Sequence, residues 1–163
     1  MQFNSVYNKC KKIYCYEVDP YNIDIAQSNL SKYDFVEIRQ KAVASKKGEM
    51  YLYTNKADTS NTQTVFDIEE KGSVVESVAL DEDNIEKIDF IKMDIEGGEQ
   101  EALRGCTRHI KENKTKLAIC TYHGNEDIWK IPRMVDAVRD DYNFYMRYNG
   151  GTGFPTEYVF FAL

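Results

Sequence analysis

The sequence lacks several features that would place it in a specialised class of protein. The longest apolar stretch, residues 158–163, is far shorter than the roughly 20 residues that a helix needs to cross a bilayer. The first residues lack the charged-then-apolar pattern of a secretory signal. The four cysteines form no C-x-x-C pair and have no histidine at zinc-ligand spacing, which favours reduced thiols over a disulfide framework or a zinc site. We therefore expect a cytoplasmic protein that does not enter the membrane.

Positive charge is also scarce. The chain has 21 Lys and Arg against 27 Asp and Glu, for a net charge of -6, and the basic residues do not cluster. Such a surface repels phosphate, so we expect no nucleic-acid partner. The 163 residues are 42% hydrophobic and 29% charged, as in ordinary globular proteins. This length predicts one domain, 1–163, with a sizeable core.

Short β-type runs alternate with helical patterns along the chain. Asp19 followed by Pro20 predicts a helix start, because Asp is a good N-cap and the missing N–H of proline costs nothing in the first turn. Further helices are expected after Gly98 and from Ile128. Strands are expected at 13–16, 36–39, 49–54, 74–80, 89–94, 116–122, 144–148 and 158–162. Alternating strands and helices predict an α/β fold with a mainly parallel sheet, and the last two strands predict an antiparallel hairpin.

The segment after Gly98 is expected to form one amphipathic helix. Leu103, Cys106 and Ile110 are spaced i, i+3 and i+7, which places them in one apolar stripe. His109 lies between Arg108 and Lys111, so we expect it on the surface.

Three of the expected strands end in ionisable residues: Glu17, the pair Asp94 and Glu96, and His123. In an open parallel sheet, ligands bind beyond the carboxyl ends of the strands. The two carboxylates of the pair would point the same way if the extended conformation persisted between them. Each residue also has a structural interpretation: a solvated acid before a helix, a helix cap, or an ordinary loop histidine.

Several segments resemble one protein family. These are 13–20, the strand end 78–81, the block Asp-Phe-Ile-Lys-Met-Asp-Ile-Glu-Gly-Gly-Glu at 89–99, Glu-Ala-Leu-Arg-Gly at 101–105, and 116–123 with 126–132. Together they resemble the FkbM family of S-adenosylmethionine-dependent methyltransferases over nearly the whole chain. The Asp-Ile-Glu-Gly-Gly-Glu block is the most specific part.

This resemblance implies a Rossmann-like methyltransferase sheet and S-adenosylmethionine as cofactor. In such enzymes the acid after the second strand accepts hydrogen bonds from the ribose hydroxyls of the cofactor, a role that falls here on Glu17, with Val18 beside it. The turn after the third strand, which contains Lys41 and Ala42, would lie along the adenine. Asp94 would face the methionine end and the methyl group.

The reaction that the resemblance implies is O-methylation of a small hydroxylated acceptor, such as a sugar or another metabolite. The enzyme must align the reacting atoms and help to remove the hydroxyl proton. His123 has the most suitable unperturbed pKa for that base, and Asp94 or Glu96 would orient it. Alternatively these acids would hold a divalent cation, and their oxygen atoms suit magnesium rather than zinc. Both interpretations stay open, with Asp94, Glu96 and His123 as the catalytic residues.

One element of the family pattern is absent from the sequence. Such methyltransferases begin with a strand and a glycine-rich turn that binds the cofactor, whereas residues 1–12 contain no glycine. In the family's sheet this first strand lies between the second and the fourth, and without it both neighbours would have open edges. We therefore expect a partial domain that is truncated, completed by another chain or a second copy, or rearranged. The alternative function is a non-catalytic, methyltransferase-like module that does not bind the cofactor alone.

Overall fold

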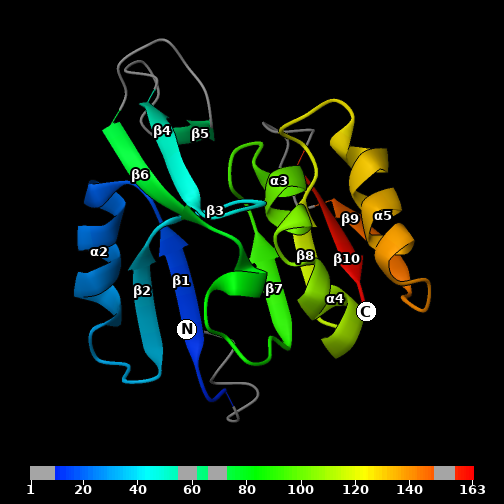
Figure 1. Cartoon of the computed structure of the whole chain (residues 1–163), viewed down its shortest axis with the longest axis horizontal. Coiled ribbons are helices and arrows are strands. Elements are labelled where there is room, and N and C mark those ends of the chain that lie inside the picture. Colours follow the sequence, from blue (N-terminus) through cyan, green and yellow to red (C-terminus); the bar gives the residue numbers. More distant parts are fainter. Residues whose placement is uncertain (1–9, 55–61, 66–72, 149–156) are drawn as a thin grey trace. The chain divides into compact units, whose positions relative to one another are not determined.

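Two units of structure, residues 1–42 and 43–163, make up the chain. The computed structural model, shown as a cartoon in Figure 1, describes residues 10–54, 62–65, 73–148 and 157–163. Residues 149–156, between the two strands of the expected carboxy-terminal hairpin, lie outside the described residues. None of the helices within the described ranges has the length and apolar composition needed to cross a membrane.

The first unit is a strand–helix–strand arrangement. It contains β1 (Ile13–Glu17), α2 (Pro20–Leu30) and β2 (Val36–Gln40). β1 and β2 pair in parallel, in a sheet separate from the other two. The side chain of Asp19 accepts a hydrogen bond of 2.8 Å from the backbone N–H of Tyr21. This cap, followed by proline in the first turn, confirms the helix start predicted from the sequence.

The second unit contains the sheet that carries the candidate site. Its strands are β7 (Phe90–Met93), β8 (Lys116–Cys120), β10 (Tyr158–Ala162) and β9 (Phe144–Tyr148), in the order β7-β8-β10-β9. β7 and β8 are parallel, whereas β10 pairs antiparallel with both β8 and β9. The carboxy-terminal hairpin predicted from the sequence is therefore confirmed.

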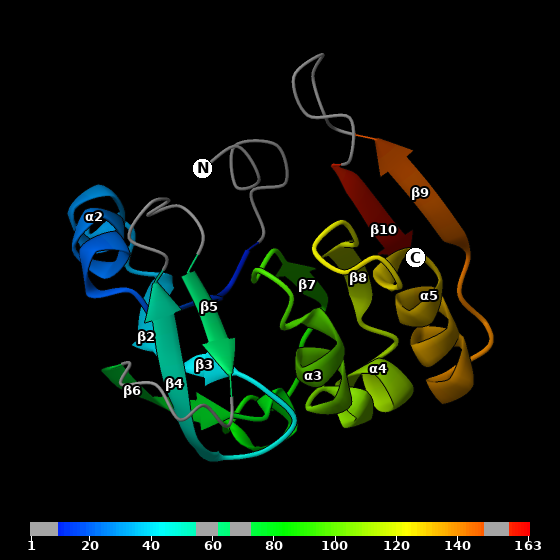
Figure 2. The same cartoon turned by 90° about the horizontal axis from the view of Figure 1, so that it is seen from above.

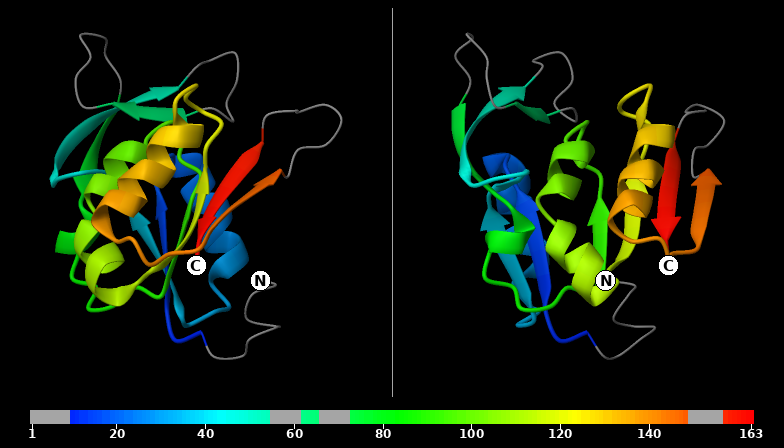
Figure 3. Two further views of the ribbon diagram at one scale, coloured as in Figure 1. Left: turned by 90° about the vertical axis from the view of Figure 1, so that its right-hand side faces the viewer. Right: turned by 45° about the vertical axis from the view of Figure 1, so that its right-hand side comes forward.

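Three helices lie on one face of this sheet: α3 (Glu99–Arg104), α4 (Thr107–Asn113) and α5 (Asp127–Val138). Figures 2 and 3 show all three on the same side of β7, β8 and β10. Along β7, buried Ile91 and Met93 alternate with exposed Phe90 and Lys92. This alternation places Ile91 and Met93 on the covered face and Phe90 and Lys92 on the other, as the period of a strand requires.

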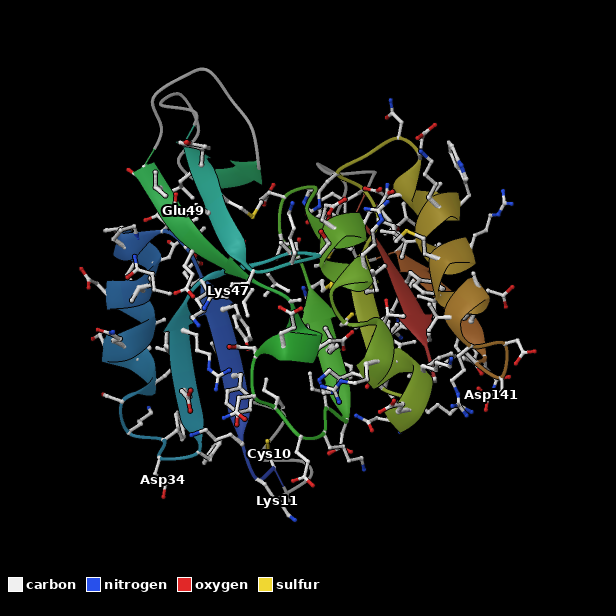
Figure 4. All side chains as sticks on the ribbon, viewed as in Figure 1. Cys10, Lys11, Asp34, Lys47, Glu49 and Asp141 are labelled. Atoms are coloured by element: carbon white, nitrogen blue, oxygen red, sulfur yellow. The ribbon has the colours of Figure 1, made fainter. Side chains whose placement is uncertain are left out.

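A second four-stranded sheet has the order β3-β6-β4-β5. Its strands are β3 (Ala42–Val43), β6 (Ser73–Val78), β4 (Gly48–Thr54) and β5 (Thr62–Val65), and β4 pairs antiparallel with both β5 and β6. Lys47 and Glu49, on either side of the glycine that begins β4, are exposed (Figure 4). The short helix η1 (Leu80–Glu82) follows β6.

The expectation of a mainly parallel sheet is corrected by these pairings. The fold is α/β, but the described strands form mixed and antiparallel sheets besides the parallel pairs β1–β2 and β7–β8. The reason lies in the connections. Strands joined by fewer than a dozen residues, such as β4 to β5 and β9 to β10, pair antiparallel, because a parallel crossover needs a dozen or more residues.

The helix expected after Gly98 is two helices. α3 ends at Arg104 and α4 begins at Thr107, with Gly105 between them. The predicted apolar positions Leu103, Cys106 and Ile110 are nevertheless all buried. The apolar positions of both short helices are therefore buried despite the break between α3 and α4.

The expectation that His109 lies on the surface is wrong, because its side chain is completely buried in α4. Its ring atom Nδ1 lies 3.0 Å from the amide nitrogen of Asn113, and Nε2 lies 3.3 Å from the backbone oxygen of Leu80. These polar partners compensate for the loss of water around the imidazole. Charged sequence neighbours therefore did not indicate which side of the helix this residue occupies.

Candidate functional site

Asp94, Glu96 and His123 come together at one edge of the β7–β8 pair. The two strands are parallel, so their carboxyl ends meet at the same edge of the sheet. Nε2 of His123 lies 3.4 Å from Oε2 of Glu96 and 3.7 Å from Oδ1 of Asp94. One ligand atom from each of the three residues lies within 4.8 Å of the others. The structure thus brings together the three residues that the sequence assigned as catalytic.

A tight turn positions the carboxylate of Glu96. Glu96 has φ 55° and Gly97 has φ 99°, and the N–H of Gly98 donates to the carbonyl of Ile95 across the turn. Positive φ at both central positions is the pattern of a type I′ turn, which glycine tolerates and glutamate does not favour. The extended conformation considered for residues 94–96 therefore does not persist. A side chain larger than glycine's at such a φ costs of order 1–3 kcal/mol, and strain of this kind is concentrated at functional sites.

Glu99, the first residue of α3, fixes the orientation of His123. Its side chain is fully buried, and Oε1 accepts hydrogen bonds from Nδ1 of His123 and from the backbone N–H of Ile95, both at 2.9 Å. A carboxylate accepting at Nδ1 places the proton there and turns the Nε2 atom outward. Glu99 therefore holds the imidazole in place from the side opposite Asp94 and Glu96.

Nε2 of His123 is buried and has no hydrogen-bond partner within the described residues. The side chain as a whole is only 9% exposed. Separations of 3.4 and 3.7 Å to the two carboxylates are too long for good hydrogen bonds, which lie near 2.7–3.2 Å. A buried polar atom without a partner costs free energy, so Nε2 has the properties of an atom that binds something the chain itself does not supply.

Asp94 is held by two neighbouring side chains. The hydroxyl of Tyr122 donates to Oδ1 at 2.9 Å, and Nζ of Lys92 lies 3.3 Å from Oδ2. Burial alone would raise the pKa of Asp94, but this hydrogen bond and the nearby ammonium together hold the pKa below its usual value. The Tyr122 ring also packs against the ring of His123, with centroids 4.2 Å apart. Asp94 is therefore an ionised carboxylate of fixed position at neutral pH.

Asp127 holds the loop that carries His123 in place through two hydrogen bonds. Oδ2 of Asp127, a buried residue, accepts a hydrogen bond of 2.8 Å from the N–H of Gly124, and Oδ1 accepts one of 2.7 Å from the amide of Gln100 on α3. A Cβ at Gly124 would lie 2.7 Å from that same carboxylate, so a larger residue here would displace the Asp127 side chain. These contacts connect the loop after β8 to the helix after β7.

We expect the pKa of His123 to lie above the ordinary histidine value and the pKa of His109 to lie below it. Burial alone would lower the pKa of His123, but Glu99, Glu96 and Asp94 outweigh burial and raise it. Burial and the charge of Arg108 lower the pKa of His109. The charged form of His123 thus stabilises the fold in full below about pH 6.5, and this contribution is lost as the pH rises through its raised pKa. NMR titration of chelator-treated protein, assigned with variants that each lack one histidine, measures both values.

A second titration, of a Glu99 variant, distinguishes the effect of the neighbouring carboxylate on the pKa of His123 from the effect of burial. Glu99→Gln keeps an oxygen that can accept from Nδ1 but removes the charge, so the pKa of His123 should fall while that of His109 stays unchanged. Equal values for the two histidines in the wild-type protein would contradict the assigned environments.

The residues assigned to the cofactor belong largely to the first unit. Oε1 of Glu17 accepts from the N–H groups of Val18 at 2.7 Å and Asp19 at 2.9 Å, which holds the carboxylate at the end of β1. Its other oxygen is contacted by the amide of Asn22 at 3.4 Å. An oriented carboxylate with spare acceptor capacity fits a pair of ribose hydroxyls. Lys41 follows β2, and Ala42 is buried in β3.

Two residues of the site were not anticipated from the sequence. Glu99 is the last residue of the block at 89–99, and Tyr122 is the last residue of an expected strand, but the sequence assigned neither to the site. For Glu99, the available signal was its position four residues after Ile95, a spacing that lets a first-turn acid reach back to a free backbone N–H. Nothing in the local pattern indicated that Tyr122 contacts Asp94.

Comparison with known proteins identifies the family. The model of the methyltransferase FkbM domain matches residues 2–149. The crystal structure of methyltransferase FkbM from Methylobacillus flagellatus has a similar fold, with a TM-score of 0.78 and 23% sequence identity; the match covers 99% of this chain and 39% of that one. A comparison with proteins of curated function found no match. Because the domain match spans most of the sequence, the chain belongs to the FkbM methyltransferase family.

Proposed function

We propose that the chain takes part in S-adenosylmethionine-dependent methylation of a hydroxyl group on a small molecule, such as a sugar. The observation that carries the proposal is the convergence of Asp94, Glu96 and His123 where β7 and β8 end. This edge of a parallel strand pair is where α/β folds bind ligands, and the family match makes methyl transfer the reaction to consider.

The cofactor would be held mainly through Glu17. S-adenosylmethionine supplies an electrophilic methyl group on a positively charged sulfonium. Glu17 would accept hydrogen bonds from the ribose hydroxyls, with Val18, Lys41 and Ala42 contributing to the nucleoside part and Asp94 facing the methyl end. The carboxylates of Asp94 and Glu96 also provide the negative potential that a cationic group requires.

The acceptor hydroxyl is the nucleophile in this reaction. Its oxygen forms a bond to the methyl carbon while the carbon–sulfur bond breaks, the electron pair remains on sulfur, and the hydroxyl proton must be removed. Two chemistries would remove that proton: direct transfer to Nε2 of His123, or ionisation of a hydroxyl bound to a cation that the three residues would hold. Both use Asp94, Glu96 and His123 together.

Calorimetric titration with S-adenosylhomocysteine tests the proposal. We expect micromolar binding to the folded chain and a loss of roughly ten- to a hundred-fold in Glu17→Gln, as for a hydrogen bond to a charged group. The substitution keeps an oxygen for the N–H groups of Val18 and Asp19 but replaces the other acceptor with a donor. Glu37→Gln, on neighbouring β2, is the matched control and should bind as wild type.

A folded chain without detectable binding would contradict the proposal. It would support the second candidate, a methyltransferase-like module without catalytic activity of its own.

A further inference from the structure

The unpartnered Nε2 atom faces two carboxylates, which is the arrangement of ligands around an ion. The carboxylates of Asp94 and Glu96 are 41% and 30% exposed, whereas the imidazole is 9% exposed. The site is therefore open on the carboxylate side and closed on the imidazole side. Nε2 supplies evidence independent of the acidic pair, because it is buried, lacks a hydrogen bond and is aimed between the two carboxylates.

The separations of these atoms fit a shared cation better than direct hydrogen bonds. Ligand atoms about 2.1 Å from one ion, at angles of about 90–120°, lie roughly 3.0–3.6 Å from one another. The measured distances from Nε2 are 3.4 Å to Glu96 and 3.7 Å to Asp94. The separation to Glu96 falls within this range, and the separation to Asp94 lies just beyond it.

The residues that hydrogen-bond to these ligands are also typical of a metal site. Metal-binding histidines commonly donate their second N–H to a carboxylate, which fixes the tautomer and the ring orientation. Glu99 accepts from Nδ1 of His123 at 2.9 Å and is itself held by the N–H of Ile95. The hydroxyl of Tyr122 holds Asp94 in the same way. Two of the three ligands thus have a fixed supporting partner.

We propose that Asp94, Glu96 and His123 bind one divalent cation of the Mn²⁺ type, which in turn binds the acceptor hydroxyl; the second clause rests on the proposed function. Two carboxylates suit Mg²⁺ and Mn²⁺, and the imidazole favours a transition metal over Mg²⁺. Three protein ligands leave coordination positions open for the acceptor and for water. The bound hydroxyl releases its proton to solvent, and the resulting alkoxide is the nucleophile.

The test is titration of the chelator-treated chain with Mn²⁺, followed by the loss of the free-ion signal in electron paramagnetic resonance. We expect one saturable site per chain, filled below about 1 mM. Asp94→Asn and Glu96→Gln should each weaken binding at least ten-fold. Glu99→Gln, which changes no ligand, should weaken it roughly ten- to a hundred-fold through the orientation of His123. Circular dichroism of each variant confirms folding.

Asp89→Asn is the matched control, because it removes one carboxylate just before β7 and outside the cluster; its carboxylate pairs with Lys87. Binding should equal that of wild type. Absence of a saturable site in the wild type, or equal affinities in all variants, would overturn the cation proposal. S-adenosylhomocysteine titrated into the wild-type and Glu17→Gln chains reports on the proposed function separately, because Glu17 is the proposed ribose contact and is not a ligand of the cation.

Discussion

Replacing His123 is expected to lower the rate of methyl transfer roughly 10²- to 10⁴-fold, the usual contribution of a positioned group that removes a proton. The affinity for S-adenosylhomocysteine should change little, because His123 is not among the residues proposed to hold the cofactor. This split between turnover and cofactor affinity follows whether Nε2 takes the proton directly or binds a cation. The measurement is transfer of a radiolabelled methyl group to a panel of monosaccharides and simple alcohols, with the rate compared on any acceptor that the wild-type chain methylates.

The choice of variant matters because His123 shares a buried hydrogen bond with Glu99. His123→Ala leaves the fully buried carboxylate of Glu99 without this donor, which costs stability as well as function. In His123→Asn the side-chain amide can still donate to Glu99, but no atom replaces Nε2. We expect both variants to lose turnover and the second to remain folded.

Asn125→Ala is the control for this experiment, since Asn125 is exposed two residues further along the same loop. Its turnover should match that of the wild type. Wild-type turnover in His123→Asn would remove His123 from the chemistry and leave it a structural residue of the loop.

The positions of the charged strand ends could be predicted from the sequence. Runs of apolar residues mark β7 and β8, and the carboxyl ends of adjacent parallel strands meet at one edge, so Asp94 and His123 are brought together by topology alone. Glu96 lies close to His123 for a different reason from the one expected. The chain leaves the extended conformation after Met93 and turns at Gly97, and the positive φ of Glu96 directs its side chain back toward His123.

The supporting residues could not be predicted in the same way. Whether Glu99 faces solvent or a buried imidazole depends on the position of the loop after β8, which lies more than 20 residues away in the sequence. His109 illustrates the same limit, because a histidine between two basic residues is buried by contacts with η1 that no local pattern reveals. Burial of a polar residue depends on partners distant in sequence, whereas strand and helix periodicity is local.

The break between α3 and α4 also depends on a distant segment. The spacing of Leu103, Cys106 and Ile110 predicted their burial but not the interruption at Gly105. Gly105 has φ -82° and ψ 0°, a conformation open to any residue, so backbone freedom does not explain the glycine. The explanation is space: an added Cβ would lie 1.9 Å from the backbone oxygen of Ala44 and 3.2 Å from Cα of Ala79.

Gly105→Ala is accordingly expected to destabilise the fold by about 3 kcal/mol, at the upper end of the usual cost of overpacking a core. The clashing atom belongs to the backbone of a buried residue, so no side-chain rotation relieves it. The carbonyl of Gly105 also accepts a hydrogen bond of 2.8 Å from the N–H of Asp81, which restricts movement of the helix junction. Urea denaturation followed by circular dichroism measures the change in the free energy of unfolding.

Gly48→Ala makes the same chemical change at the start of β4, where the nearest atom to an added Cβ is the Ser77 hydroxyl at an ordinary 3.6 Å. It should alter stability by no more than about 0.5 kcal/mol, because the methyl group fits and alanine restricts the unfolded chain. The contrast between the two variants isolates the close contact with Ala44 from the general effect of replacing glycine. Similar urea midpoints for Gly105→Ala and Gly48→Ala would contradict this prediction, because they would mean that the junction between α3 and α4 shifts to accommodate the extra methyl group at little cost.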